Sequence, residues 1–268
     1  MIAELIADRM GELPAGERRA AQTLVANYPL IGLKTVAEFA QAAGVSSPTI
    51  LRFVARLGFH NYSEFQASLQ EELAAQLQSP AARPLGPEGA VSPMVEATVD
   101  NIRETFRHLS DRQVDEIVRR LTERRGHMYL VGGRFTDPLA RYMAAHLAII
   151  RPNVFHLAGQ ESMWRDRLID MGKRDVLLIF DIRRYQESLL DIAEKAHRRG
   201  VQIILFTDQW LSPVTKFARH VIAGRTAVPS AWDSSAALFV VAETLIGAIT
   251  RQLEADSARR LREMENLR

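Results

Sequence analysis

The chain has 268 residues, enough for two domains, and combines 47% hydrophobic with 25% charged residues, as globular proteins in solution do. It contains no cysteine, which excludes disulfides, thiolate metal sites and cysteine nucleophiles. The longest apolar segment, 236–249, is interrupted by Glu243 and is shorter than the roughly 18 residues of a membrane span. The first ten residues, MIAELIADRM, carry acids early and no basic segment before an apolar stretch, so no secretion signal is predicted. We therefore expect a cytoplasmic protein with no membrane partner.

The net charge of +2 does not by itself predict a nucleic-acid partner. Residues 1–78 contain six Lys or Arg against eight Asp or Glu, a balance of −2. Within 34–62 the sign reverses, with Lys34, Arg52 and Arg56 against Glu38. Any DNA affinity of this half must therefore arise from local geometry and dimerisation rather than from overall charge.

Residues 36–57, VAEFAQAAGVSSPTILRFVARL, have the pattern of a helix-turn-helix. Thr35 followed by Glu38 is a capping box that begins the first helix, and Gly44 suits the left-handed turn after it. Ser46 is expected to cap the second helix, whose first turn tolerates Pro48. Apolar residues at helical spacing predict a core of Val36, Phe39, Ala40, Val45, Ile50, Phe53, Val54 and Leu57.

The second helix of this motif would direct small polar and cationic side chains away from that core. Arginine suits bidentate contact with guanine, whereas Ser and Thr serve base edges or phosphates. Residues just beyond it would meet phosphates near the N-terminus of the following helix. The predicted DNA contacts are Lys34, Ser46, Ser47, Pro48, Thr49, Arg52, Arg56, His60, Asn61 and Tyr62. The alternative is an ordinary helical hairpin with a solvated arginine face.

Residues 79–93, SPAARPLGPEGAVSP, are rich in proline and glycine and have no period, which predicts a linker. Further helices are predicted at about 14–27, 61–77, 94–109 and 111–125. The predicted domains are therefore a helix-turn-helix domain over 1–78 and an effector-binding and dimerisation domain over 94–268.

Beyond Gly126, short β-rich runs alternate with helical segments. These runs are HMYLV (127–131), NVFHL (153–157), DVLLIF (175–180), VQIILF (201–206) and HVIA (220–223). Such alternation predicts a three-layer α/β domain with a five-stranded parallel sheet covered on both faces. Residues from 233 to about 268 are expected to form one long helix, whose polar final third frays or packs on a partner subunit.

The segments VAEFAQAAGVS, TILRFVARLGF and NYSEF resemble the N-terminal domain of the MurR/RpiR family of bacterial transcriptional regulators, over about residues 1–77. The resemblance implies DNA binding as a dimer, with Ser46, Ser47, Thr49, Arg52 and Arg56 on the DNA side. The second half is similar to the sugar-isomerase (SIS) domain that follows in this family. A palindromic double-stranded operator, a small-molecule effector and a homodimer or homotetramer are the implied partners.

The SIS-like half departs from the usual pattern in its ligand loops. A loop that usually reads roughly G-x-G-x-S is GGRFT here, and the usual S-x-S-G-x-T loop is replaced by DIRRYQES. Strand ends are the default ligand position in parallel sheets, and guanidinium groups can bind a carboxylate or phosphate. The predicted effector contacts are Gly132, Gly133, Arg134, Thr136, Asp181, Arg183, Arg184, Tyr185, Ser230 and Asp233. The alternative is a solvated loop in a domain that only oligomerises.

An enzymatic alternative is a sugar-phosphate isomerase with an accessory helical domain. Isomerisation needs a placed base, for which Glu161 and Glu243 are available, but no phosphate-binding hydroxyl loop is recognisable. The seven histidines show no metal-ligand spacing, so neither a metal nor a cofactor is expected. The sequence thus predicts a non-enzymatic transcriptional regulator that senses an anionic metabolite, such as a sugar phosphate or another phosphate or carboxylate compound.

Overall fold

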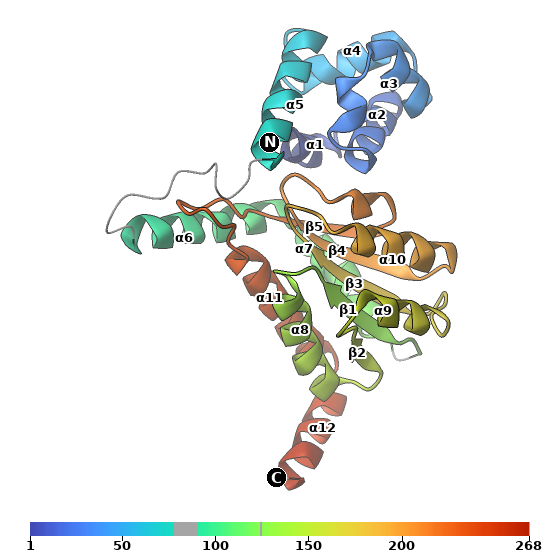
Figure 1. The fold of residues 1–268 in the computed structure, drawn as a ribbon, viewed down its shortest axis with the longest axis vertical. Helices are drawn as coiled ribbons and strands as arrows, with labels where there is room; N and C mark the ends of the chain where they lie inside the picture. The colour runs from blue at the N-terminus through green and yellow to red at the C-terminus, as the bar shows by residue number, and fades with distance from the viewer. Residues whose placement is uncertain (78–90, 124, 268) are drawn as a thin grey trace.

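The computed structural model describes residues 1–77, 91–123 and 125–267 (Figure 1). Its helical part comprises α1 (Ile2–Arg9), α2 (Ala15–Ala26), the 3-10 helix η1 (Leu30–Leu33), α3 (Val36–Ala43), α4 (Ser47–Arg56) and α5 (Tyr62–Leu77). Two further helices, α6 (Val91–His108) and α7 (Asp111–Leu121), precede the sheet. The α/β part comprises β1 (Met128–Gly132), α8 (Asp137–Ile150), β2 (Val154–His156), α9 (Glu161–Leu168), β3 (Val176–Asp181), α10 (Glu187–Arg198), β4 (Gln202–Asp208), η3 (Pro213–Lys216), β5 (His220–Gly224), α11 (Ala236–Gln252) and α12 (Glu254–Asn266).

The helix-turn-helix forms as its capping residues predict. Thr35 and Glu38 complete a reciprocal capping box at the start of α3, and Gly44 ends that helix with φ 61° in the left-handed region. Phe39 and Phe53 meet edge to face, with ring centroids 6.4 Å apart, and both are fully buried. These contacts fix the angle between α3 and α4, so the hydrophobic core orients the second helix.

The sheet has the strand order β2-β1-β3-β4-β5, and all of its strand pairs are parallel. The five-stranded parallel sheet predicted from the sequence is therefore confirmed. Side chains of β3 alternate between the two faces: Val176, Leu178 and Phe180 join one core cluster, while Leu177 and Ile179 join the other. A strand buried on both faces must be apolar throughout, which explains the continuous run DVLLIF.

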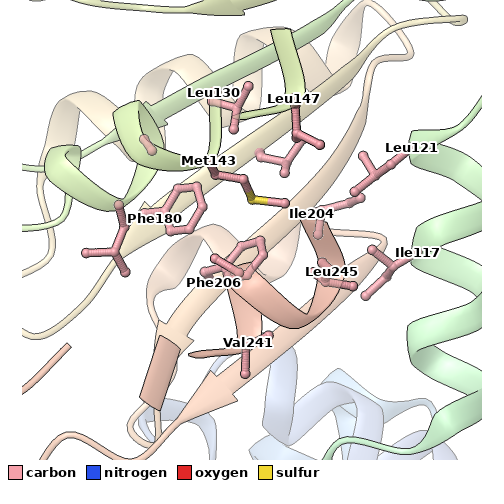
Figure 2. Close-up of a cluster of buried hydrophobic side chains, with 14 of the residues drawn as sticks. Ile117, Leu121, Leu130, Met143, Leu147, Phe180, Ile204, Phe206, Val241 and Leu245 are labelled. Carbon is pink, nitrogen blue, oxygen red and sulfur yellow. The ribbon is translucent and has the colours of Figure 1, made fainter. Parts of the chain in front are cut away.

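Helices cover both faces of the sheet. The face packed against α7, α8 and α11 holds the larger cluster, in which Met143 and Leu245 close over Phe180 and Phe206 (Figure 2). Phe180 and Phe206 stack with centroids 4.3 Å apart. The opposite face is covered by α9 and α10. This rigid three-layer frame positions the loops that follow β1 and β3.

The C-terminal helix is not continuous, so the predicted single helix from residue 233 is wrong. The chain leaves helical geometry at Leu253 (φ −103°, ψ 26°), and α12 turns by 100° relative to α11. The turn lets α12 pack on α8, where Arg260 donates to the carbonyl oxygens of Ile149 and Ala148, each at 2.8 Å. Within the described ranges no single helix is long and apolar enough to cross a membrane, and only this bent pair passes that test when joined.

The predicted linker is shorter at its C-terminal end than the sequence indicates. Residues 91–93 belong to α6, whose first turn accommodates Pro93 without losing a helical hydrogen bond. The rest of the predicted linker, 79–90, lies outside the described residues.

The helical domain lies against the carboxyl-terminal end of the sheet. Glu4 of α1 pairs with Arg225, which follows β5, at 2.6 Å, and Asp8 contacts His108 of α6 at 2.8 Å. α3 and α4 lie on the side of the helical bundle away from the sheet (Figure 1). The exposed helix of the motif is thus separated from the α/β domain by the rest of the bundle.

Candidate functional sites

The outward face of α4 is formed by Pro48, Leu51, Arg52 and Ala55, all of them exposed. Ile50, Phe53 and Val54 occupy the opposite face and are buried. Leu51 was not predicted as a contact, although it is 47% exposed. Because residues 50, 53 and 54 form the buried face of the helix, Leu51 must point outward. An apolar side chain there suits contact with a thymine methyl group.

Hydroxyl groups hold the Arg52 guanidinium at this face. Ser46 Oγ lies 2.9 Å from Thr49 Oγ1, which accepts a hydrogen bond from Arg52 Nη2 at 3.2 Å. Ser46 occupies the N-cap position of α4, but its side chain bonds Thr49 rather than a backbone amide. The prediction that Ser46 caps the helix is therefore right in position and wrong in its hydrogen bond. Ser47, like Thr49, is only half-buried at the start of the helix.

Arg56 is held by the helical bundle. Its Nε donates to Glu17 Oε2 of α2 at 2.6 Å, and Glu17 is only 4% exposed. The Arg56 carbonyl oxygen also accepts a hydrogen bond from Arg9. These contacts give Arg56 a structural role, joining α4 to α1 and α2.

Residues that follow α4 mostly stabilise the bundle. Asn61 Oδ1 accepts from the Glu64 amide at 2.8 Å and so caps α5 as predicted. The Tyr62 hydroxyl lies 3.0 Å from the Gly32 oxygen and 2.9 Å from the Lys34 oxygen, to which it donates. Lys34 and His60 are exposed.

A cavity of about 570 Å³ opens where β1 and β3 end. The connections from these two neighbouring strands leave in opposite directions, and such a switch point is the usual ligand site of parallel α/β sheets. Its lining includes the predicted residues Gly133, Arg134, Thr136, Asp181, Arg183, Arg184 and Asp233, together with Phe135, Ile182, Gln186, Trp232 and Ser235.

Arg183 is a buried, paired residue rather than an open cation. Its Nη2 lies 3.0 Å from Asp233 Oδ1, and its guanidinium carbon lies 3.8 Å from the centre of the Trp210 ring. Its Nη1 donates to the carbonyl oxygen of Ala75, in the last turn of α5, at 2.9 Å. One guanidinium therefore joins the wall of the cavity to the helical domain.

Two buried carboxyl groups lie at the ends of β3 and β4. Asp181 accepts from Ser212 Oγ and from the Gln186 amide, and burial raises its pKa to about 7. Asp208 accepts from the Tyr185 hydroxyl at 2.7 Å, and burial raises its pKa to about 6. Tyr185 is thus directed to Asp208 and does not line the cavity.

Backbone amides of the loop after β1 are already used. The Gly133 amide donates to the Phe180 oxygen and to Thr136 Oγ1, and the Asp137 amide donates to the Gly133 oxygen at 2.8 Å. The Arg134 amide donates to Gln186 Oε1 at 3.2 Å. These amides therefore have partners within the protein, and the positive charge of the lining comes from the guanidinium groups of Arg134, Arg183 and Arg184.

Two predicted residues shape the site from outside. A Cβ on Gly132 would lie 2.5 Å from the Asp137 nitrogen, so glycine allows β1 to meet α8. Ser230 Oγ accepts from the Trp232 amide at 3.2 Å and so shapes the turn that carries Trp232.

Exposed aromatic and cationic side chains surround the cavity mouth. Phe135 is 52% exposed and Trp232 55%, and their ring centroids lie 5.7 Å apart. Arg134 lies 5.2 Å from the Phe135 centroid and Arg184 5.9 Å from the Trp232 centroid. Neither guanidinium has a hydrogen-bond or ion-pair partner in the part of the chain that the structure describes.

Comparison with known proteins defines the class. Residues 1–76 match the model of the helix-turn-helix domain of the rpiR family, and residues 120–248 match that of the SIS domain. The chain is thus a transcriptional regulator with a helix-turn-helix domain and a SIS domain. It belongs to the MurR/RpiR family.

The individual relatives have low sequence identity to this chain but match it over most of its length. The HTH-type transcriptional regulator HexR of Pseudomonas aeruginosa is 24% identical over 213 residues, covering 76% of this chain and 72% of HexR. The sugar isomerase domain of an RpiR transcription factor from Sphaerobacter thermophilus superposes with TM-score 0.61 and 19% identity, over 65% of this chain and 96% of that one. The Vibrio vulnificus NanR protein complexed with ManNAc-6P superposes with TM-score 0.58 and 14% identity, over 100% and 98% of the two chains. At these identities the structural likenesses establish the fold.

Proposed function

We propose that this regulator reads DNA with α4 and senses a small anion in the cavity at the ends of β1 and β3. The observation that carries the proposal is the double attachment of Arg183, to Asp233 in the cavity wall and to Ala75 in α5. This contact gives a ligand in one domain a direct route to the other domain. The similarity of the whole chain to the Vibrio vulnificus NanR protein, which is complexed with ManNAc-6P, supports a small-molecule effector.

The coupling between the cavity and α5 would depend on the Arg183 guanidinium, which keeps its positive charge. Arginine stays protonated in proteins, so Arg183 must keep a carboxylate or a comparable partner when it is buried. An anion in the cavity would compete with Asp233 for this guanidinium or move Asp233 away from it. Either change would alter the contact with α5 and so the position of the reading helix.

We propose Arg52 as the main base-reading residue, with Leu51 beside it. Both Arg52 and Arg56 are exposed, but only Arg56 is held in an ion pair, with Glu17. Lys34 and His60, both exposed, are proposed to meet phosphates. Recognition thus depends on a few side chains, in keeping with the acidic balance of residues 1–78.

Twofold assembly on a palindromic operator would use a second copy of the chain. α6 carries Val91, Val95 and Val99 on one face, and these valines are 77%, 55% and 37% exposed. The beginning of α6 extends away from the rest of the α/β domain (Figure 1). An apolar stripe on a projecting helix favours self-association, because burial against a partner removes it from water.

The bases expected for an isomerase have other contacts. Glu161 accepts from Gln186 Nε2 at 2.6 Å and from Ser188 Oγ at 2.7 Å, and Glu243 accepts from the Tyr142 hydroxyl at 3.0 Å. Neither carboxylate lines this cavity, although Glu161 lines an adjoining one that shares Gly133, Arg134 and Gln186 with it. The geometry therefore favours a sensor over an enzyme.

The test is selection of genomic DNA fragments by the full chain, followed by footprinting and gel-shift titration. Arg52→Ala should weaken operator binding by about 1–3 kcal/mol, roughly 5- to 150-fold. Arg19→Ala removes another exposed arginine, from α2, and serves as the matched control with unchanged affinity. Equal affinities for both variants would refute the assignment of α4, and protected sites without paired half-sites would refute the twofold arrangement.

A further inference from the structure

The polar lining of the cavity is largely engaged within the protein. Thr136 Oγ1 donates to the Phe180 carbonyl oxygen, and Gln186 Nε2 donates to Glu161 and Ser188. Asp181 accepts from Ser212 and from the Gln186 amide. Beyond Ser235 and the guanidinium groups of Arg134 and Arg184, a ligand with many hydroxyl groups would find few side-chain partners here, and each unpaired buried hydroxyl has a free-energy cost.

What the cavity offers instead is aromatic surface next to positive charge. Phe135 and Trp232 expose about half of their surfaces, and their ring planes meet at 57°. Both rings belong to the lining of the cavity. A third ring inserted there would gain edge-to-face and offset contacts together with the burial of apolar area.

Arg134 and Arg184 lie next to these rings. Their guanidinium groups have no protein partner within the described ranges, although each lies within 6 Å of an aromatic centroid. Arg184 also adopts φ 65°, a left-handed conformation that is uncommon for a residue with a side chain. Such backbone strain persists where the surroundings fix it, and it is typical of ligand sites.

We infer that the effector site takes an anion that carries a flat aromatic ring, such as an aryl phosphate or an aromatic carboxylate. The ring packs against Trp232 and Phe135, and the anionic group binds Arg184 and Arg134. A volume of about 570 Å³ accommodates a ring and a charged group together. This inference rests on the proposed effector site and specifies its ligand class.

Binding of phenyl phosphate, benzoate, glucose 6-phosphate and inorganic phosphate to the full chain tests the ligand class. Trp232 is 55% exposed at the cavity mouth, whereas the buried Trp210 stacks on Arg183 in the cavity wall. The part of a ligand-induced fluorescence change that Trp232→Leu abolishes therefore reports on the cavity mouth. Calorimetry gives the affinities. We expect phenyl phosphate or benzoate to bind about tenfold or more tightly than either ringless anion, because one aromatic contact contributes up to about tenfold and the site offers two.

Variants separate the ring contact from the charge contact. Trp232→Leu and Phe135→Leu should each weaken binding of the aromatic anion about 3- to 10-fold and leave that of inorganic phosphate unchanged. Phe155→Leu removes a partly exposed ring of β2 outside the cavity lining and should change neither affinity. Circular dichroism of each variant checks that the fold is kept.

The results that would overturn the aromatic ligand class differ from those that would count against the proposed function. Tighter binding of glucose 6-phosphate, or equal binding of phenyl and inorganic phosphate, would overturn the aromatic ligand and leave the effector site standing. Absence of binding by both aromatic anions would also overturn it. Tight aromatic binding that leaves operator affinity unchanged would uphold the ligand class and count against the proposed function.

Discussion

Replacement of Arg183 by methionine should destabilise the folded chain severely, although the residue belongs to a ligand loop. The side chains of Arg183 and Asp233 are only 4% and 8% exposed. Methionine would leave the Asp233 carboxylate and the Ala75 carbonyl oxygen without this donor. Removing one partner of a buried ion pair costs about 3–5 kcal/mol, since the remaining charge stays desolvated.

The measurement is urea unfolding of the full chain, followed by circular dichroism. Arg183→Met should lower the free energy of unfolding by about 3–5 kcal/mol, and Asp233→Asn should also lower it. The double variant should be less destabilised than the sum of the single variants by about 0.5–3 kcal/mol, which is the usual coupling of residues in contact.

The adjacent arginine is the matched control. Arg184→Met changes an exposed side chain and should stay within about 0.5 kcal/mol of the parent protein. If Arg183→Met unfolds within 1 kcal/mol of Arg184→Met, the buried pair does not hold the two domains as described.

Other perturbations test the reading domain, the core and the buried acid. Arg56→Ala should lower the free energy of unfolding by about 1–3 kcal/mol in urea titrations, because Glu17 loses its charged donor; an unchanged midpoint would contradict the structural role of Arg56. Phe206→Ala, opposite Phe180, should cost about 3–5 kcal/mol in the same assay, and a loss below 1 kcal/mol would mean that the core refills the space. Burial raises the pKa of Asp181 to about 7, so the folded state retains a proton that the unfolded state releases, and stability should fall as pH rises from about 4 to 7. Asp181→Asn should flatten this part of the stability profile, and an equally steep profile would assign the proton to another group.

Local signals explain why much of the fold could be predicted. Thr35, Glu38 and Gly44 act on their immediate neighbours, so a helix start and a turn follow from the sequence alone. The strands are predictable because a parallel sheet buried on both faces leaves apolar runs such as DVLLIF. The break at Leu253 lacks such a signal, since tertiary packing of α12 on α8 accompanies it.

Partners distant in sequence explain what could not be predicted at the sites. The sequence around Arg56 gives no sign of its ion pair with Glu17 of α2, which forms although the Arg56 side chain stays 47% exposed. The sequence suggests that the Arg183 guanidinium is available to an anion, whereas in the fold it pairs with Asp233 and donates to the Ala75 carbonyl oxygen. Hydrophobic periodicity predicts on which face of a helix a residue lies, but not which charged side chain from a distant element will contact it.

The same long-range contacts limit how strongly the two sites can influence each other. A ligand shifts the reading domain only by the difference between its affinities for the two arrangements of Arg183. Coupling of this kind is typically about 1–3 kcal/mol, which corresponds to a 5- to 150-fold change in operator affinity. Direct release of Arg183 from Asp233 without a substitute would cost more than this, because the guanidinium would stay buried and charged. A ligand held by Trp232, Arg134 and Arg184 would instead shift Asp233, which follows Trp232 in the chain, together with Arg183. The buried charge then stays compensated, and the coupling stays within the range that regulation requires.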